Sequence, residues 1–501
     1  MAEQTTIPVP RARARARRHG GGETRRRRVR RRPALHWWLG AAVALLAVSA
    51  AIVIVTDMRP GYDAFGWLVW GHQVLHWNLN TDGAPSWKPM PFLFTLPYAL
   101  LGKGQMSMWN VTAVAGALAG GVFGARIAHR LTGRSPGRRL APWVAAALAG
   151  VGVLGISGYA HQVLIANSDP IVVGVCLAAI DSHLSRRFRL ALGLLVLASL
   201  GRPEVWPFAV GYAGWAWRSV PRARVLAVAG VALIPILWFS VPALTSKSWF
   251  TPGDLALSSV NPVNIIHGNR ILGVLNRLRE LYESSMQVAV LVAVAVAGLA
   301  RDRRLLALTG LAAVWVAIEI GFALHGWSAA ARYLFEPAAV MVVVTAGAVG
   351  RVLAWAPGPR PLPVRVRAVG WIGPVAVAGL LVALVPVAGT RVNDTHDDLS
   401  MARATGRQID RLQAVIAQDG GARRIEACGQ PVTLVGNQSA VAWAVGLNVG
   451  NVGYTPGRSI RRGTPIVVFK PHQHGWQVRP FNVAKPDTDD CESLRLDSDF
   501  G

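Results

Sequence analysis

Long apolar segments recur along this 501-residue chain, and they constrain its fold more than any other feature of the sequence. A helix needs about 20 apolar residues to cross the hydrocarbon core of a bilayer. Segments of this length or slightly shorter lie at 35–56, 107–129, 141–163, 170–185, 188–203, 205–218, 223–244, 285–300, 304–325, 337–356 and 369–389. The sequence therefore predicts a polytopic α-helical membrane protein with about eleven transmembrane helices. The spans between 141 and 218 are short or closely joined, which leaves this count open by two.

The charge of the chain is large, with 52 Lys and Arg against 26 Asp and Glu and a formal net charge of +26. On a folded basic domain such a charge indicates nucleic-acid binding. Here twelve arginines lie within 11–32, a tract that cannot bury a core, and we expect 1–34 to form a disordered cytoplasmic tail. Only 16% of all residues are charged, against about a quarter in soluble domains. These values exclude a soluble cytoplasmic enzyme, and we expect no nucleic-acid partner.

The arginines of the middle of the chain fall in alternate connections, which sets the expected topology. They gather at 126–139, 186–189, 218–224, 301–304 and 351–367, so the positive-inside rule makes these connections and the N-terminus cytoplasmic. Most acids lie in the opposite connections, of which 57–106 and 245–284 are long. The sequence predicts an integral plasma-membrane protein with a transmembrane domain over 35–389 and any chemistry on the noncytoplasmic face.

Residues 390–501 follow the last predicted span on this outer side and read as a small extracytoplasmic α/β domain. A helix is expected over 394–418, and strands over 431–435, 465–469 and 476–481. Two of the three cysteines, Cys428 and Cys491, lie in this region. Because the outer compartment is oxidising, we expect them to form a disulfide, the alternative being two unpaired thiols.

The first outer connection carries the most informative residues. Asp63 opens a Trp-rich segment that suits a helix at the membrane interface, and Lys88 precedes the segment Pro89-Met90-Pro91. An acid in the first turn also stabilises a helix by itself, which is the simpler reading of Asp63. His72 and His76 share a face of this helix and form a weak metal-binding pair, with interfacial packing as the alternative. A divalent metal is thus left open as a cofactor.

The Tyr62-Asp63 sequence just after the first span, the interfacial helix and the Lys88-Pro89 segment together resemble the GT-C superfamily of membrane glycosyltransferases. This superfamily includes protein O-mannosyltransferases, the lipid A aminoarabinose transferase and actinobacterial cell-wall enzymes. The resemblance covers 35–390 and implies transfer from a polyprenyl-phosphate sugar at the noncytoplasmic face. It implies that Asp63 is the first-loop acid and that Asp169, in the turn before the fourth span, is the second. The sequence Asn167-Ser168-Asp169-Pro170 is also good turn chemistry, so both readings of Asp169 stay open.

Such a transfer needs a carboxylate to remove the acceptor proton and cations to hold the leaving phosphate. Asp63 suits the first role and Lys88 the second, and direct displacement would invert the anomeric carbon. Polar residues at outer span ends add candidate contacts to the donor phosphate and sugar: Arg202, Glu204, Arg332, Tyr333 and Glu336. An Arg202–Glu204 pair and snorkelling side chains are the simpler readings. On the acceptor side, the second outer connection offers Trp249, His267 and Arg270, although it could serve only to join two spans.

The sequence predicts a glycosyltransferase whose partners are a lipid-linked sugar donor and a glycan, lipid or protein acceptor. Two alternatives from other classes remain. A secondary transporter or lipid flippase would also have many spans, but its ionisable residues usually lie at the midplane of related halves. A noncatalytic cell-envelope scaffold would not need Asp63 or Lys88. Neither the sugar nor the acceptor follows from the residues.

Overall fold

The computed structural model describes residues 35–83, 87–133, 139–258, 265–354, 369–418, 420–472, 475–482 and 491. The predicted disordered tail over 1–34 and most of the Arg-rich connection at 351–367 lie outside these residues.

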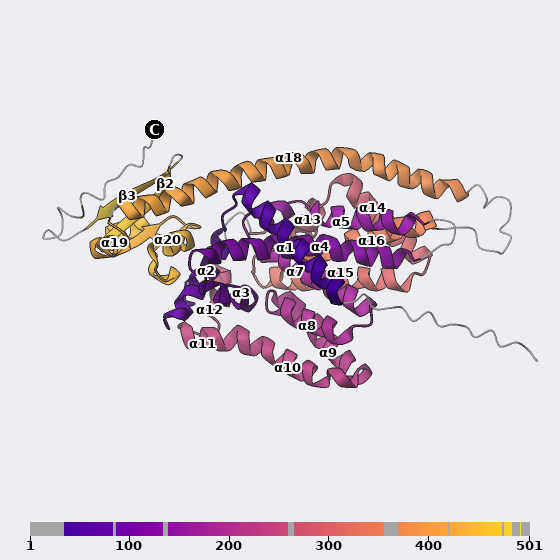
Figure 1. Cartoon of the computed structure of the whole chain (residues 1–501), viewed down its shortest axis with the longest axis horizontal. Coiled ribbons are helices and arrows are strands. Elements are labelled where there is room, and N and C mark those ends of the chain that lie inside the picture. The colour runs from indigo at the N-terminus through magenta and orange to yellow at the C-terminus, as the bar shows by residue number, and fades with distance from the viewer. Residues whose placement is uncertain are drawn as a thin grey trace, which may run out of the picture. The chain divides into compact units, whose positions relative to one another are not determined.

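Helices make up most of the described chain (Figure 1). The first half contains α1 (Leu35–Thr56), α2 (Tyr62–Leu75), α3 (Pro89–Ala99), α4 (Gly104–Thr132), α5 (Ala141–Leu154), α6 (Tyr159–Leu164), α7 (Asp169–Leu184), α8 (Phe188–Ser199), η1 (Pro203–Val205), α9 (Trp206–Ser219), η2 (Pro221–Ala223), α10 (Arg224–Pro235), η3 (Ile236–Ser240) and α11 (Val241–Thr245). The second half contains α12 (Thr251–Ser258), α13 (Arg270–Glu280), α14 (Ser284–Leu299), α15 (Arg303–Leu324), η5 (Ala331–Leu334), α16 (Phe335–Ala354) and α18 (Val369–Gln418). The C-terminal segment contains α19 (Ala422–Cys428), β1 (Gln430–Thr433), α20 (Gln438–Val445), η6 (Val449–Asn451), α21 (Pro456–Arg461), β2 (Ile466–His472) and β3 (Gly475–Phe481).

Six helices in the described parts of the chain are long and apolar enough to cross a bilayer, and the bent pair of α13 and α14 would raise the number to seven. The chain is an integral membrane protein, but the predicted count of eleven spans is not confirmed. The difference arises where apolar sequence is interrupted. The predicted span 141–163, for example, becomes α5 and α6, because the chain turns between them at Gly158, whose φ is 73°.

The helices pack around two apolar clusters. One is formed mainly by α4, α5, α7, α15 and α16, and the other by α2, α3, α4 and α7 to α10. Helix α4 belongs to both, and small residues let it approach its neighbours closely. A Cβ atom added to Gly174 of α7 would collide with the carbonyl oxygen of Gly116 of α4. Contacts of this kind hold helices together in membranes, where apolar burial alone does not.

Helix α18, the long orange helix of Figure 1, is continuous over 50 residues. The predicted span 369–389 and the predicted helix 394–418 are therefore parts of one helix. Residues 390–405 contain neither glycine nor proline, the residues that most readily end a helix. Ion contacts join α18 to other parts of the chain. Arg391 lies 3.1 Å from Glu283 just before α14, Asp398 lies 3.2 Å from His161 of α6, and Asp410 lies 2.9 Å from Arg59 before α2.

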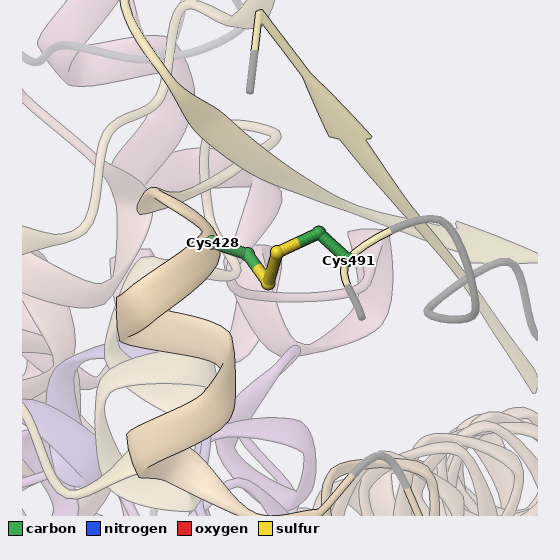
Figure 2. The surroundings of a disulfide bond; sticks show 2 residues. All are labelled: Cys428 and Cys491. Atoms are coloured by element: carbon green, nitrogen blue, oxygen red, sulfur yellow. A yellow bond between two sulfur atoms is a disulfide. The ribbon is translucent and has the colours of Figure 1, made fainter. Parts of the chain in front are cut away.

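The C-terminal segment contains a three-stranded sheet in the order β1-β2-β3. β1 pairs in parallel with β2, aligning Val432 with Val468, and β2 pairs antiparallel with β3, aligning Val468 with Arg479. All three strands lie where the sequence predicts them. Figure 2 shows the disulfide that joins Cys428, at the end of α19, to Cys491, with 5.7 Å between the Cα atoms. This is the predicted pair of cysteines.

Candidate active site

Asp63 is positioned by a close contact between the connection that joins α1 to α2 and the turn before α7. The Gly61 amide donates to the Ile165 carbonyl at 2.8 Å, and a Cβ atom at Gly61 would lie 3.1 Å from that of Ile165. Helix α2 begins at the next residue and places Asp63 in its first turn. The Asp63 side chain is 20% exposed, and its Oδ2 lies 3.4 Å from Nη2 of Arg332. Asp63 is thus a first-turn acid that also faces a cation.

Asp169 is the first residue of α7, and the turn before it is tight. Ala166 has a positive φ of 52°, and the Asn167 side chain accepts from the Ser168 amide at 2.7 Å. The Asp169 carboxylate is fully buried and contacts two guanidinium groups. Arg202 Nη2 donates to its Oδ1, and Arg332 Nε lies 3.5 Å from its Oδ2. The structure therefore adds a charge network to the turn chemistry of this residue.

Arg202 is held on three sides. It is only 3% exposed, and besides Asp169 it faces Glu204, with 3.6 Å between Nη1 and Oε1. The ring of Tyr333 lies against its guanidinium group, whose Cζ is 4.0 Å from the ring centroid. The expected Arg202–Glu204 pair is present as one part of this larger arrangement. Because two carboxylates and a ring surround it, the Arg202 side chain is occupied by contacts within the protein.

The pKa of Asp169 reflects these surroundings. Burial alone raises the pKa of this carboxyl, because it disfavours the charged form. The positive charges of Arg202, Lys88 and Arg332 outweigh burial and lower the pKa below its ordinary value. Asp169 is therefore a stable anion that holds cations near it.

Lys88 is the third cation of the site. It is the extended residue before α3, whose first position is Pro89, and its Nζ lies 5.6 Å from the ring centroid of Trp67. Its positive charge is one of the three that lower the pKa of the Asp169 carboxyl. Within the described residues, Lys88 makes no ion pair, whereas both arginines do. Lys88 is thus the cation with the most freedom to bind an anion from outside.

Three more carboxyl groups of the candidate site are buried: Glu204, Glu319 and Glu336, each at most 4% exposed. Glu319 comes from α15, and its Oε1 has no hydrogen-bond partner among the described residues. Neither oxygen of Glu336 has a hydrogen-bond partner among the described residues. In the sequence, Glu319 is a lone acid within an apolar segment, and such acids in membrane proteins mark functional or paired positions.

The structure brings together all the predicted acidic and donor-side residues: Asp63, Lys88, Asp169, Arg202, Glu204, Arg332, Tyr333 and Glu336. The expected acceptor-side residues have other contacts. Arg270 donates to the carbonyls of Ala323 and Leu324 at the end of α15, and the Trp249 ring packs on Phe239 and Phe250. His267 lies exposed before α13.

The histidines of α2 favour the packing interpretation. The His72 ring lies 5.2 Å from the ring of Trp443, and burial lowers the pKa of His72. No group of three or more His, Cys, Asp or Glu side chains within the described ranges is placed to hold a metal ion.

The C-terminal segment contacts α2 beside Asp63. The residues that make this contact could not be predicted from the sequence. Ser439 of α20 donates to the carbonyl oxygen of Tyr62 at 2.6 Å, and the Trp443 ring lies 6.4 Å from that of Phe65. Burial, together with the charge of Asp63, raises the pKa of Tyr62 above its ordinary value. Helix α20 therefore covers one side of the candidate site.

The fold matches two solved structures of ArnT, an aminoarabinose transferase of the GT-C type, from Cupriavidus metallidurans. The structure bound to undecaprenyl phosphate has a TM-score of 0.50 at 14% identity, and the apo structure has 0.51 at 15%. Each match covers 87% of this chain and 93% of the other. No protein-family model matches the chain, and no curated protein sequence does. At this identity the likeness concerns the fold: the chain has the fold seen in ArnT.

Proposed function

We propose that this protein is a membrane glycosyltransferase that moves a sugar from a polyprenyl-phosphate donor to an acceptor at the extracytoplasmic face. The observation that carries the proposal is the cluster in which Arg332 lies between Asp63 and Asp169, with Lys88 beside it. This cluster combines a carboxylate that can accept a proton with cations that can hold a phosphate. The ArnT fold, seen in complex with undecaprenyl phosphate, supports the same donor class.

Exposure and partners distinguish the roles of the two aspartates. Asp169 is fully buried, and both of its oxygens face arginines. Asp63 is 20% exposed and has one ion contact at 3.4 Å, so an acceptor hydroxyl can reach it. We therefore assign the general base to Asp63 and the positioning of Arg202 and Arg332 to Asp169.

Exposure and partners also distinguish the roles of the three cations. Arg202 is buried and doubly paired, whereas Arg332 is 28% exposed with ion contacts of 3.4 and 3.5 Å, and Lys88 has no ion pair within the described residues. Lys88 and Arg332 are thus the groups that can bind the donor phosphate. A guanidinium can contact two phosphate oxygens, and an ammonium adds a further point charge.

The proposed reaction is a single displacement. The acceptor oxygen attacks the anomeric carbon while Asp63 takes its proton. The bond between that carbon and the phosphate oxygen breaks, and its electron pair leaves with the polyprenyl phosphate, whose charge Lys88 and Arg332 stabilise. Attack opposite to the leaving group inverts the anomeric configuration.

The test is transfer of radiolabel by the purified protein from a panel of polyprenyl-phosphate sugars to cell-envelope glycan, lipid and protein fractions. The proposal expects label to enter one acceptor fraction from at least one donor. Absence of transfer from every donor, by protein that is folded and binds undecaprenyl phosphate, would contradict it.

Replacement of Lys88 is expected to weaken donor binding. Lys88→Ala removes one charge-assisted contact worth about 1.5–3 kcal/mol, so the Kd for undecaprenyl phosphate should rise roughly 10- to 150-fold. Titration calorimetry in detergent measures this change. Lys88→Arg should retain most of the affinity. The matched control is Lys103→Ala, at the exposed start of α4; equal binding by Lys88→Ala and the control would exclude Lys88 as a phosphate ligand.

The contact between α20 and α2 predicts an acceptor-side role for the C-terminal segment. Trp443→Ala removes a ring that packs on both Phe65 and His72 and should loosen α20 beside Asp63. We expect the acceptor KM to rise about tenfold, as for a buried aromatic anchor, with the donor Kd unchanged. Steady-state transfer kinetics at saturating donor give the acceptor KM. Trp143→Ala, in an exposed position on α5, is the control, and an unchanged acceptor KM in Trp443→Ala would reject this role.

A further inference from the structure

A cavity lined by arginines lies where α14, α15 and α16 meet, away from the candidate active site. Its volume is about 410 Å³, and four arginines contribute to its lining: Arg301, Arg303, Arg304 and Arg351. Arg351 and Glu336 both belong to α16 and are fifteen residues apart. At 1.5 Å per residue, about 22 Å of helix separates the cavity from the active-site end.

The shape of the cavity is set by a tight connection between α14 and α15. Arg301 adopts a positive φ of 50°, and the Asp302 side chain accepts from the amides of Arg304 and Leu305 at 3.0 and 3.4 Å. Asp302 also pairs with Arg351 at 2.7 Å. The amides at the start of α15 are thus already capped, so an anion in the cavity would be bound by arginine side chains.

The charges of the cavity are unbalanced. Four guanidinium groups and the single carboxylate of Asp302 give its lining a net charge of +3. Arg301, Arg303 and Arg304 are exposed, and none of the three pairs with a carboxylate in the described parts of the chain. A net charge of +3 is more than a single carboxylate could neutralise, and it suits a phosphate group.

The rest of the lining is apolar. Val296 and Ala297 of α14 line the cavity, and Leu299 at the end of this helix is 88% exposed. An exposed leucine at the end of an apolar helix suits contact with acyl chains. A ligand in the cavity therefore contacts both arginines and apolar side chains, a combination that suits a phospholipid.

We propose that this cavity binds the phosphate headgroup of an anionic phospholipid, at the membrane face opposite to the active site. Basic pockets between transmembrane helices bind such headgroups. The site is independent of the transfer reaction, because none of its arginines contacts Asp63, Asp169 or their partners among the described residues.

The experiment compares lipids by thermal melting and native mass spectrometry of the full-length protein in detergent. Phosphatidylglycerol should raise the melting temperature and remain bound, whereas phosphatidylcholine should do neither. The triple variant Arg301→Ala/Arg303→Ala/Arg304→Ala should bind phosphatidylglycerol about 100-fold more weakly, at about 1 kcal/mol per lost charge, and keep its transfer activity. A triple variant with lysines at these positions retains the charges and should retain binding.

A matched triple variant separates this site from a general effect of basic loops. Arg189→Ala/Arg218→Ala/Arg222→Ala removes the same number of exposed arginines from other connections and should bind phosphatidylglycerol like the wild type. The proposal would be overturned if phosphatidylglycerol and phosphatidylcholine raised the melting temperature equally. It would also be overturned if the two alanine triple variants lost phosphatidylglycerol binding to the same extent. Stabilisation by inorganic phosphate that matches that of the lipid would assign the cavity to a soluble anion and overturn the lipid assignment. If the alanine triple does not fold, Arg303→Ala alone should weaken binding about fivefold, and unchanged binding there also overturns it.

Discussion

Asp63→Asn should fold, insert into the membrane and bind the donor, yet transfer sugar about 10²- to 10⁴-fold more slowly than the wild type. The amide keeps the size of the carboxyl group and still places an oxygen near Arg332, which lies 3.4 Å from the native Asp63 oxygen. It cannot accept the proton of the acceptor hydroxyl. The loss should therefore appear in kcat, with little change in the donor KM.

The matched control for this variant is Asp57→Asn, in the connection that joins α1 to α2. Asp57 is exposed and pairs with Arg59 at 2.7 Å, outside the candidate site. Its replacement should leave kcat unchanged. If Asp63→Asn retains wild-type kcat at equal membrane level, Asp63 is not the base.

Asp169→Asn is expected to cost both stability and activity. The change leaves the buried Arg202 with Glu204 as its remaining ion partner at 3.6 Å. Removing one partner of a buried ion pair typically costs about 3–5 kcal/mol. Arg332 also loses a contact at 3.5 Å, so the donor phosphate meets misplaced cations. Thermal melting and transfer assays should both show large losses.

The other end of the same helix offers a control of matched chemistry. Asp181 of α7 is 4% exposed and pairs with Arg126 at 3.1 Å and Arg130 at 2.9 Å. Asp181→Asn should lower the melting temperature in a similar way while the residual folded protein keeps its kcat. If Asp169→Asn and Asp181→Asn lose kcat to the same extent, Asp169 acts only through stability, and the proposal that it positions the arginines is wrong.

The sequence predicted the class of fold because apolar length and arginine placement are local signals. It could not predict the number of helices, since α5 and α6 separate at a turn that apolar composition does not reveal. It also divided α18 in two, because the change from apolar to polar residues near 390 resembles a domain boundary. The strands and the cysteine pair of the C-terminal segment could be predicted from short β-branched runs and the expected compartment.

For the candidate site, residue chemistry predicted the members but not their partners. Asp63, Asp169, Arg202 and Arg332 stand out as ionisable groups next to apolar spans, yet they come from four separate segments. Only the packing of α2, α7, η1 and η5 shows that Arg332 lies between the aspartates and that Arg202 is enclosed. Contacts such as Ser439 with Tyr62 join residues 377 positions apart, and no local pattern indicates them.

The most direct test of the central claim is the anomeric configuration of the product. A donor that the purified protein accepts would be prepared as a single anomer, labelled with ¹³C at C1, and the transferred sugar would be read by NMR before any anomerisation. Single displacement at the Asp63 site predicts a product that is entirely inverted and that Asp63→Asn forms about 10²- to 10⁴-fold more slowly than the wild type. A retained configuration, or the same product from Asp63→Asn at the wild-type rate, would contradict the account.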